Sequence, residues 1–426
     1  MFCNCNFLNE LDVKNFDTSS AVDMSFMFEG CTKLESLDIS NFKTGNVKNF
    51  NSMFWGCANV KKLDVQYFDT YRALDMGGMF QYCGALKSID VSKFKTSNVR
   101  NMKGMFRRYK ELTSIDVSRF DTGSVTDISE MFNECSSLSS LDVSNFDTRN
   151  VRDMSSMFYL CSNLETLDVK NFVTSNVENM AYMFHSLNKI ESLDVSKFDT
   201  SKVTDMSSMF YTCRNLLKLD VTNFNTKNVK DMSYMFSELS RITSLDVSKF
   251  DTSGCENMLA MFQNCRQLKS IDVSKFNTDK VNDMACMFQN CENIKQFELS
   301  NWKTAENTDF YKTFDGCSEL TEMRLNHFDT RKVKDMAFMF QNCYKLKTLI
   351  ISNFDTSKVT DMSYMFHGCT VLDNVDYKNF NTENVENMSY MFAGCKAMTR
   401  IDLTSFNTKN VKDMSYMFQL CSELIY

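Results

Sequence analysis

Hydrophobic residues recur along this chain with a period of 26 residues. A phenylalanine opens each repeat, from Phe16 to Phe406, and a tryptophan takes its place once, at Trp302. The sixteen openings follow one another without insertion or deletion. A period of roughly 20–50 residues is typical of solenoids and related repeat arrays. The pattern predicts a single solenoid over residues 1–426, made of sixteen coils of 26 residues with partial coils at both ends.

Two elements are predicted within each coil, whose positions are counted from the opening phenylalanine as position 0. Positions 8, 11, 12 and 15 are mostly Met, Met, Phe and Cys, which is the spacing of one face of a helix. Asp or Asn at position 7 is the residue type that caps a helix start. A later stretch, often Leu-Asp-Val, predicts a short strand in which Leu37 and Ile39 point inward and Asp38 points outward.

Stacking of neighbouring coils explains why the chain repeats one pattern so many times. A single coil cannot bury its apolar face, whereas coils stacked about 4.8 Å apart bury it against each other. Equivalent residues then form columns, phenylalanine on phenylalanine and threonine on threonine. The sequence therefore predicts an α/β repeat solenoid with a parallel sheet on one face and short helical turns on the other.

Composition and charge exclude several classes of protein. The chain has no proline and 12 glycines, so no linker is indicated. A net charge of −7 argues against binding to nucleic acid, and no apolar run approaches the ~18 residues of a membrane span. The N-terminal residues lack the pattern of a signal peptide. Three scattered histidines, with no phosphate loop or nucleophile motif, indicate that the protein is not an enzyme.

One motif resembles a known family along essentially the whole chain. It is carried by these residues and their equivalents in the other coils: Met365, Phe366, Cys369, Leu372, Asn379, Phe380, Thr382, Val385 and Met388. The motif resembles the BspA-type leucine-rich repeat, especially the 26-residue variant described as a mycoplasma repeat of unknown function. The resemblance implies a right-handed, leucine-rich-repeat-like coil. It also implies a surface or secreted protein of host-associated bacteria or protists, used in adhesion or interaction.

Cysteine and aspartate form two further columns. Thirteen of the 17 cysteines stand at position 15, where Tyr109, Leu187 and Leu239 also occur, so we expect buried free thiols that supply apolar bulk. The strand aspartates stack as like charges, which calcium could offset in principle. The glycine-rich, aspartate-rich turns of known calcium repeats are absent, so no metal or other cofactor is expected.

Position 10 provides the main candidates for partner binding. It should point outward, yet it is aromatic in four consecutive coils, at Phe338, Tyr364, Tyr390 and Tyr416. Exposed aromatic rings in a row could bind a sugar or a protein partner, or could stabilise the stack without any ligand.

A second candidate is a degenerate coil at about 297–327. Trp302 replaces the opening phenylalanine there, and Arg324 and His327 interrupt the following strand. This coil could be a binding patch, a bend or the result of sequence drift.

Taken together, these features predict a non-enzymatic cell-surface module for protein interaction or adhesion. Its partner would be a protein or glycan on a host or neighbouring cell. One alternative is a structural rod that self-associates end to end, since the terminal coils carry no evident cap. Another is an intracellular, cytoplasmic scaffold, which the reduced thiols and the missing signal peptide would fit.

Overall fold

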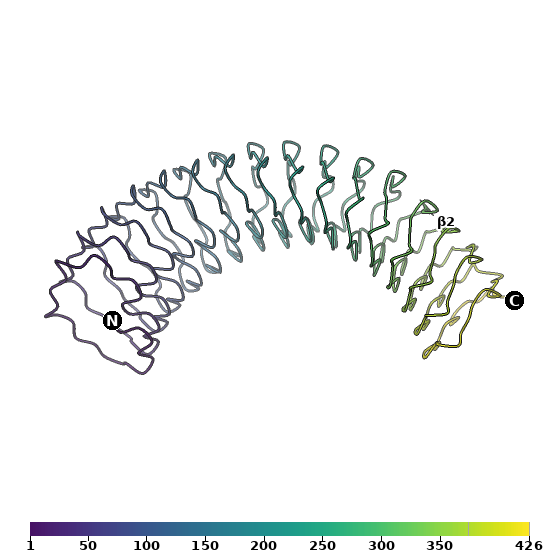
Figure 1. The fold of residues 1–426 in the computed structure, drawn as a ribbon, viewed down its shortest axis with the longest axis horizontal. Coiled ribbons are helices and arrows are strands. Elements are labelled where there is room, and N and C mark those ends of the chain that lie inside the picture. The colour runs from purple at the N-terminus through teal and green to yellow at the C-terminus, as the bar shows by residue number, and fades with distance from the viewer. Residues whose placement is uncertain (374, 426) are drawn as a thin grey trace. The chain divides into compact units, whose positions relative to one another are not determined.

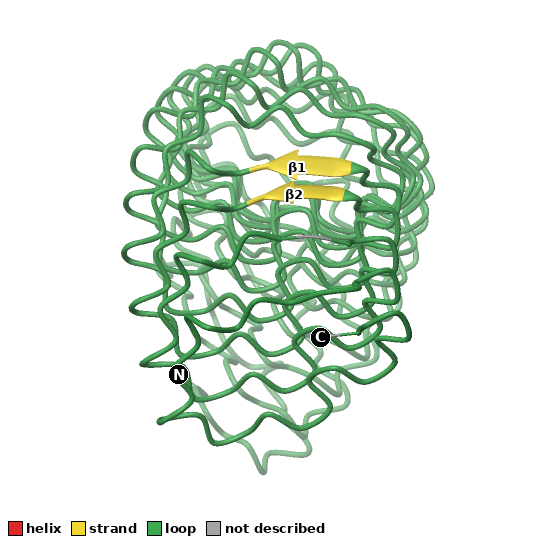
Figure 2. Ribbon diagram, turned by 90° about the vertical axis from the view of Figure 1, so that its right-hand side faces the viewer, coloured by secondary structure: helices red, strands yellow, loops and turns green. Residues whose placement is uncertain are grey.

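The computed structural model describes residues 1–373 and 375–425, and the chain divides into two compact units. The first unit contains Met1–Val203 and Met209–Leu219, and the second contains Thr204–Ser208 and Asp220–Tyr426. Each unit is a stack of similar coils, which can be followed along the chain in Figure 1 and across the stack in Figure 2. The prediction of a repeat solenoid is therefore confirmed for each unit.

The predicted parallel sheet is formed only in part. Two strands are present among the described residues, β1 (Glu322–Arg324) and β2 (Thr348–Ile350), and they pair in parallel with Glu322 opposite Thr348. Among the other described coils, two pairs have an isolated parallel bridge at this level, between Ser36 and Lys62 and between Ser192 and Lys218. The predicted alternation is nevertheless confirmed, since Leu37 and Ile39 are buried and Asp38 is exposed.

The strand aspartate forms a local turn in most coils. The Oδ1 atom of Asp38 accepts hydrogen bonds from the backbone N–H of Ser40 at 3.1 Å and from its hydroxyl at 2.7 Å. The same local turn forms at Glu298, where the backbone N–H of Ser300 donates to the Oε1 atom at 3.1 Å. The two regular strands occur where Arg324 and Ile350 replace the aspartate, so that the turn cannot form.

The predicted helix is wrong: the described part of the chain contains no helix, and positions 8–15 form two consecutive β-turns. In the coil that opens at Phe354, the N–H of Met365 donates to the carbonyl of Met362, and that of Cys369 to the carbonyl of Phe366. Backbone φ is positive at positions 10 and 14 of every complete coil, for example 57° at Tyr364 and 76° at Gly368. A positive φ at the third residue is the mark of a type II turn.

The remaining backbone donors of these turns bind the next coil. The N–H groups of positions 8, 10, 12 and 14 donate across the stack, and those of Met362, Tyr364, Phe366 and Gly368 reach the carbonyls of Asn387, Ser389, Met391 and Ala393 at 2.8–3.0 Å. A helix is about 10 Å across, whereas directly bonded backbones lie only about 5 Å apart. The coils are therefore stacked too closely for a helix in each, and we call the ladder of turns at positions 8–15 the turn face.

The chemistry predicted for position 7 is confirmed although the helix is not. The Oδ1 atom of Asp361 accepts the backbone N–H of Ser363 at 2.7 Å, and that of Asn387 accepts the N–H of Ser389 at 3.0 Å. The turn thus needs an oxygen acceptor and not a charge, as the exchange of Asp and Asn suggested.

The core consists of columns that run along each unit. The position-12 phenylalanines stack on one another, with ring centroids 6.1 Å apart for Phe132 and Phe158 and 6.0 Å apart for Phe158 and Phe184. The position-15 cysteines lie beside them as free thiols, and the Sγ atom of Cys57 donates to the carbonyl of Phe28 at 3.2 Å. Burial raises the pKa of the Cys57 thiol to about 12, so the thiol is protonated at neutral pH.

Four aspartates follow one another at position 7 in the second unit, Asp283, Asp309, Asp335 and Asp361. Elsewhere an asparagine often intervenes, and the amide of Asn101, for example, donates to the carboxylate of Asp75 at 3.1 Å. Burial, together with the neighbouring carboxylates of Asp309 and Asp361, raises the pKa of Asp335 to about 6. The ionised carboxylate of Asp335 therefore destabilises the stack at neutral pH.

We expect the substitution Asp335→Asn to raise the free energy of unfolding by about 1 kcal/mol at pH 7. A pKa that is higher in the folded state gives stability that is complete below the unfolded-state pKa and is lost as the pH rises through about 6. The advantage of the variant should therefore shrink as the pH falls from 7 to 4. Urea titrations at several pH values measure this difference, and an advantage that is independent of pH would contradict it.

Candidate interaction surface

The predicted aromatic row lies on the turn face of the second unit and forms a closely stacked column. Ring centroids are 4.6 Å apart for Phe338 and Tyr364, 4.6 Å for Tyr364 and Tyr390, and 4.8 Å for Tyr390 and Tyr416. The Nζ atom of Lys312, at position 10 of the preceding coil, lies 4.9 Å from the centroid of Phe338. The side chains therefore form one continuous column from Lys312 to Tyr416.

This stacking limits what the column can bind. Both faces of the Tyr364 and Tyr390 rings are covered by their neighbours, and the planes lie within 23° of parallel. Only ring edges and hydroxyl groups of these two tyrosines remain for a partner. The column therefore stabilises the stack in the way that ladders of identical rings do, which was the simpler interpretation of the pattern.

The residues of the degenerate coil lie apart from this column. Trp302 is in the core with 2% of its surface exposed, and its Nε1–H donates to the carbonyl of Val273 at 3.1 Å. Its side chain therefore packs between Phe276 and Phe328 and is not accessible to a partner. The wider indole ring is accommodated as a core residue.

Arg324 and His327 are exposed and line one cavity of about 360 Å³ on the strand face. The guanidinium of Arg324 pairs with Glu322 at 3.6 Å, and the Nε2 atom of His327 lies 2.8 Å from the carbonyl oxygen of Leu299. The structure thus brings two of the predicted residues together, but not with the aromatic column, which is on the turn face.

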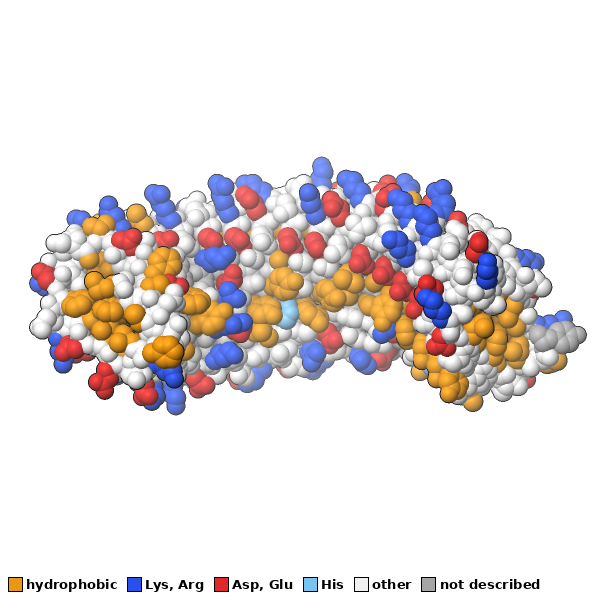
Figure 3. Space-filling model, turned by 60° about the horizontal axis from the view of Figure 1, so that its bottom comes forward, with side chains coloured by type: hydrophobic (Ala, Val, Ile, Leu, Met, Phe, Trp, Pro, Cys, Tyr) orange, Lys and Arg blue, Asp and Glu red, His pale blue; other side chains and the backbone are white. Residues whose placement is uncertain are grey.

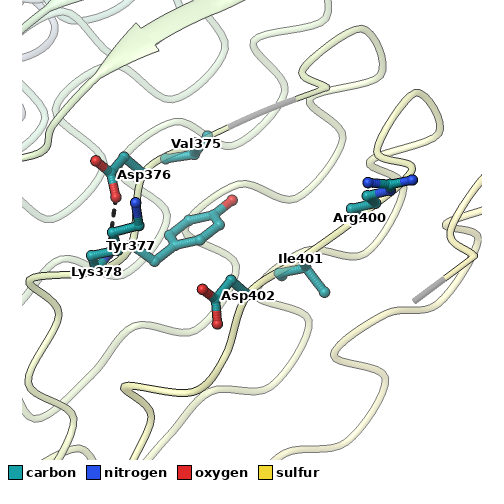
Figure 4. A pocket seen from close by; sticks show the side chains of 7 residues that line it. All are labelled: Val375, Asp376, Tyr377, Lys378, Arg400, Ile401 and Asp402. Carbon is teal, nitrogen blue, oxygen red and sulfur yellow. Dashed lines mark hydrogen bonds between the residues drawn. The ribbon is translucent and has the colours of Figure 1, made fainter.

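A second cavity on the strand face, of about 630 Å³, surrounds an unusual tyrosine (Figure 4). Tyr377 occupies a position that is valine in most coils, and its ring points toward the segment that carries Arg400 and Ile401. Its hydroxyl is buried and has no hydrogen-bond partner among the described residues, while the ring packs against Phe366 and Phe392. We attribute this cavity to the packing of a large ring at a valine position.

The strand aspartates do not gather into a metal site. Hydrogen bonds from the serine two residues later lower the pKa of Asp38, Asp116 and Asp142, so these carboxylates are ionised and already bonded. Among the described residues, no group of three or more His, Cys, Asp or Glu side chains could hold a metal ion. The repulsion along this column is offset by local donors.

The first unit contains an aromatic cluster that the sequence predictions missed. Tyr159, His185 and Tyr211 occupy position 13 of three consecutive coils, and Tyr182 lies beside them at position 10. The ring of His185 lies 4.5 Å from Tyr159, 4.8 Å from Tyr211 and 5.8 Å from Tyr182. The ring of His185 meets these rings at tilted or perpendicular angles, and we call the four residues the aromatic cluster.

The histidine of this cluster is held neutral. Its Nδ1 atom lies 2.8 Å from the Oγ atom of Ser186, and burial lowers the pKa of His185 to about 4. Tyr182 is exposed, while Tyr159 and Tyr211 are half-buried. A run of aromatic residues at position 13 was the signal in the sequence, but the spacing alone does not show that this position is half-buried in most coils and reaches the surface.

The turn face of the first unit contains further aromatic and basic side chains. The edge of Trp55 meets the ring of Tyr82 with centroids 5.2 Å apart, and the guanidinium of Arg108 lies over that ring at 4.8 Å. Arg108 also donates to the carboxylate of Glu134 at 2.6 Å. Patches of hydrophobic side chains bordered by charged ones are visible in Figure 3.

Comparisons with known proteins agree with this repeat architecture. The family model described as Mycoplasma protein of unknown function, DUF285, matches residues 1–89, 57–162, 79–193, 133–244, 184–302, 239–352 and 308–425. Among curated proteins, no match was found. No helix that could cross a membrane is present in the described residues.

Solved structures with similarity to this chain are described as leucine-rich repeat proteins. A leucine-rich repeat protein from Bacteroides ovatus is 15% identical, with 86% of each chain covered and a TM-score of 0.40. A leucine-rich cell surface protein from Faecalibacterium prausnitzii is 17% identical, with 74% of this chain and 83% of that chain covered and a TM-score of 0.38. A leucine-rich repeat protein from Eubacterium ventriosum is 15% identical, with 89% of this chain and 87% of that chain covered and a TM-score of 0.37.

The family matches overlap from residue 1 to residue 425 and follow the same 26-residue pattern that builds the turn face. The resemblance to the mycoplasma-type repeat is thereby confirmed, and this chain belongs to the family described as Mycoplasma protein of unknown function, DUF285.

Proposed function

We propose that this chain is a non-enzymatic interaction module that binds a protein partner through the turn face of its first unit. The observation that carries this proposal is the aromatic cluster, in which the partly exposed rings of Tyr159, Tyr182 and Tyr211 surround the buried ring of His185. Tyrosine, tryptophan and arginine provide most of the binding energy in protein interfaces, because they offer large, rigid surfaces with polar edges.

The neighbouring side chains support the same proposal. Trp55, Tyr82 and Arg108 add the three residue types that are most enriched at interface hot spots, on the same face of the same unit. The column from Phe338 to Tyr416 in the second unit is the weaker candidate, because most of its ring surface is already used in stacking. We place the module on the cell surface, facing a host or neighbouring cell, by its resemblance to BspA-type repeats.

The test compares binding of labelled protein to intact host cells and to intact cells of the source organism. The double variant Tyr159→Gln and Tyr211→Gln removes two rings, and glutamine occupies position 13 in five other coils, so folding should be preserved. We expect an at least tenfold loss of affinity, because each hot-spot ring contributes roughly 1–2 kcal/mol. The matched control is Tyr364→Ser in the second unit, since serine occupies position 10 in three other coils.

Equal binding by the double variant and the wild-type protein would contradict the proposed site. Protease shaving of intact source cells tests the location separately, through peptides from the region of Tyr182. Release of such peptides only after lysis would favour the intracellular scaffold instead. Filaments that grow with protein concentration, without binding to cells, would favour the rod that self-associates end to end.

A further inference from the structure

A second surface of the first unit departs from the repeat in a way that the proposed protein interface does not explain. Position 25 is asparagine in eight of the sixteen coils and lysine in four, but only one run of three consecutive coils has a tyrosine, a lysine and an arginine there, Tyr67, Lys93 and Arg119. Tyr71, at position 3, and Lys95, at position 1, lie on the same corner of the coil. No other coil has a tyrosine at position 25 or position 3. We call these five residues the corner patch.

The departure removes hydrogen bonds that other coils make. The side-chain amide of Asn171 donates to the carbonyl of Ser144 in the preceding coil at 3.2 Å, and that of Asn353 donates to the carbonyl of Asn326 at 2.8 Å. Tyrosine, lysine and arginine at the same position make no such bond in the corner patch. A hydrogen bond of this kind contributes about 1 kcal/mol, so the patch retains these residues at a cost to stability.

The tyrosines of the corner patch expose their rings to solvent. Tyr67 is 63% exposed and Tyr71 is 57% exposed, on either side of the buried Phe68. The Nζ atom of Lys95 lies 5.9 Å from the centroid of Tyr71, and Tyr71 lines a shallow groove of about 460 Å³. These two tyrosines are therefore more exposed than the stacked Tyr364 and Tyr390 of the second unit, which are half-buried.

The groove is also positively charged, although the whole chain has a net charge of −7. Three cations, Lys93, Lys95 and Arg119, line it together with one carboxylate, that of Asp121. The Oδ1 atom of Asp121 accepts the backbone N–H of Gly123 at 3.1 Å. Within the described residues, no ion pair shorter than 4.0 Å involves the three cations. Lys93 and Arg119 help to lower the pKa of Asp90 and Asp116, but neither forms a close ion pair with them, so their charge can also attract an anion.

We propose that the corner patch binds an anionic polysaccharide. Exposed tyrosine faces pack against the C–H groups of sugar rings, and lysine and arginine bind sulfate or carboxylate groups carried by the same sugars. The two tyrosines and the three cations lie on successive coils, and this arrangement suits an extended polysaccharide in which sugar rings alternate with negatively charged groups. An anionic peptide would leave the two tyrosine rings unused, and equal affinity for single-stranded DNA would point to a nucleic acid instead.

The test uses heparin as the probe at physiological salt concentration. The variant that combines Tyr67→Asn, Tyr71→Ser, Lys93→Asn and Arg119→Asn restores residues that other coils have at these positions, so we expect it to fold as stably as the wild-type protein. We expect its affinity for heparin to fall at least tenfold. The charge-matched control, Lys249→Asn with Lys275→Asn, removes the same two charges at position 25 without touching the patch and should keep wild-type affinity.

Several outcomes would overturn this proposal. They are the absence of heparin binding by the wild-type protein, an equal loss in the charge-matched control, or equal affinity for polyglutamate or for vesicles that contain phosphatidylserine. Binding of the Tyr159→Gln and Tyr211→Gln variant to heparin should be unchanged. A failure of the protein interface and a failure of the polysaccharide site are thus distinguishable.

Discussion

The substitution Phe158→Ala should lower the free energy of unfolding by about 3–5 kcal/mol. Phe158 is fully buried at position 12, and its ring lies between those of Phe132 and Phe184 with centroids about 6 Å away on both sides. Alanine would remove the packing to both neighbouring coils at once and leave a cavity. Because each coil is stabilised mainly by its neighbours, the loss should spread to the adjacent coils.

Urea titration and native-state hydrogen exchange of the amides in the coils around Phe158 measure this effect. The control Phe158→Leu keeps most of the apolar volume and should cost roughly 1 kcal/mol. A cost below about 1 kcal/mol for the alanine variant would mean that the phenylalanine column does not provide the main interaction between coils.

The substitution Thr148→Val should cost about 2–4 kcal/mol, although it hardly changes the shape of the side chain. The Oγ1 atom of the buried Thr148 accepts the backbone N–H of Val173 at 2.7 Å and donates to the carbonyl of the same residue at 2.9 Å. At this corner the threonine hydroxyl thus replaces the missing backbone bonds between coils. Valine would leave a donor and an acceptor buried without partners.

Hydrogen exchange at the amide of Val173 gives the most direct measurement. It should become faster in Thr148→Val and stay close to the wild-type rate in Thr148→Ser, which keeps the hydroxyl. Unchanged exchange in the valine variant would contradict the assignment of the threonine column as a hydrogen-bonding element between coils.

The solenoid and its core were predictable from the sequence, because a strict period places the same residues in columns. The absence of a helix was not predictable. Positions 8, 11, 12 and 15 lie on one side of a helix, and they also lie on one side of two consecutive type II turns. The positive φ at positions 10 and 14 was hidden by residues such as Tyr364 and Glu134, where glycine would have revealed it. The distance between neighbouring coils distinguishes helices from turns, because helices about 10 Å wide cannot stack at the spacing of directly bonded backbones, which is about 5 Å.

The candidate site was predicted less well, because outward-facing positions depend on the turn geometry. Phe338, Tyr364 and Tyr390 at position 10 are half-buried, because the rings stack on one another, and this stacking depends on side-chain directions. Position 13 was not recognised as outward, so the contacts of His185 with Tyr159 and Tyr211 were missed. Trp302 looked like a surface feature because it interrupts the pattern, whereas the core accommodates it.

The turn face also has a consequence for how the gene can change. Its backbone bonds join each coil to the next in the same register, as between Tyr364 and Ser389 and between Tyr390 and Ser415. Recombination between repeats can therefore remove or duplicate a segment of 26 residues and keep the same backbone hydrogen bonds between coils. This holds wherever the breakpoint lies within the coil. The length of the array and the patches on its surface can thus diversify together, by exchange of whole coils, while the interior keeps one arrangement.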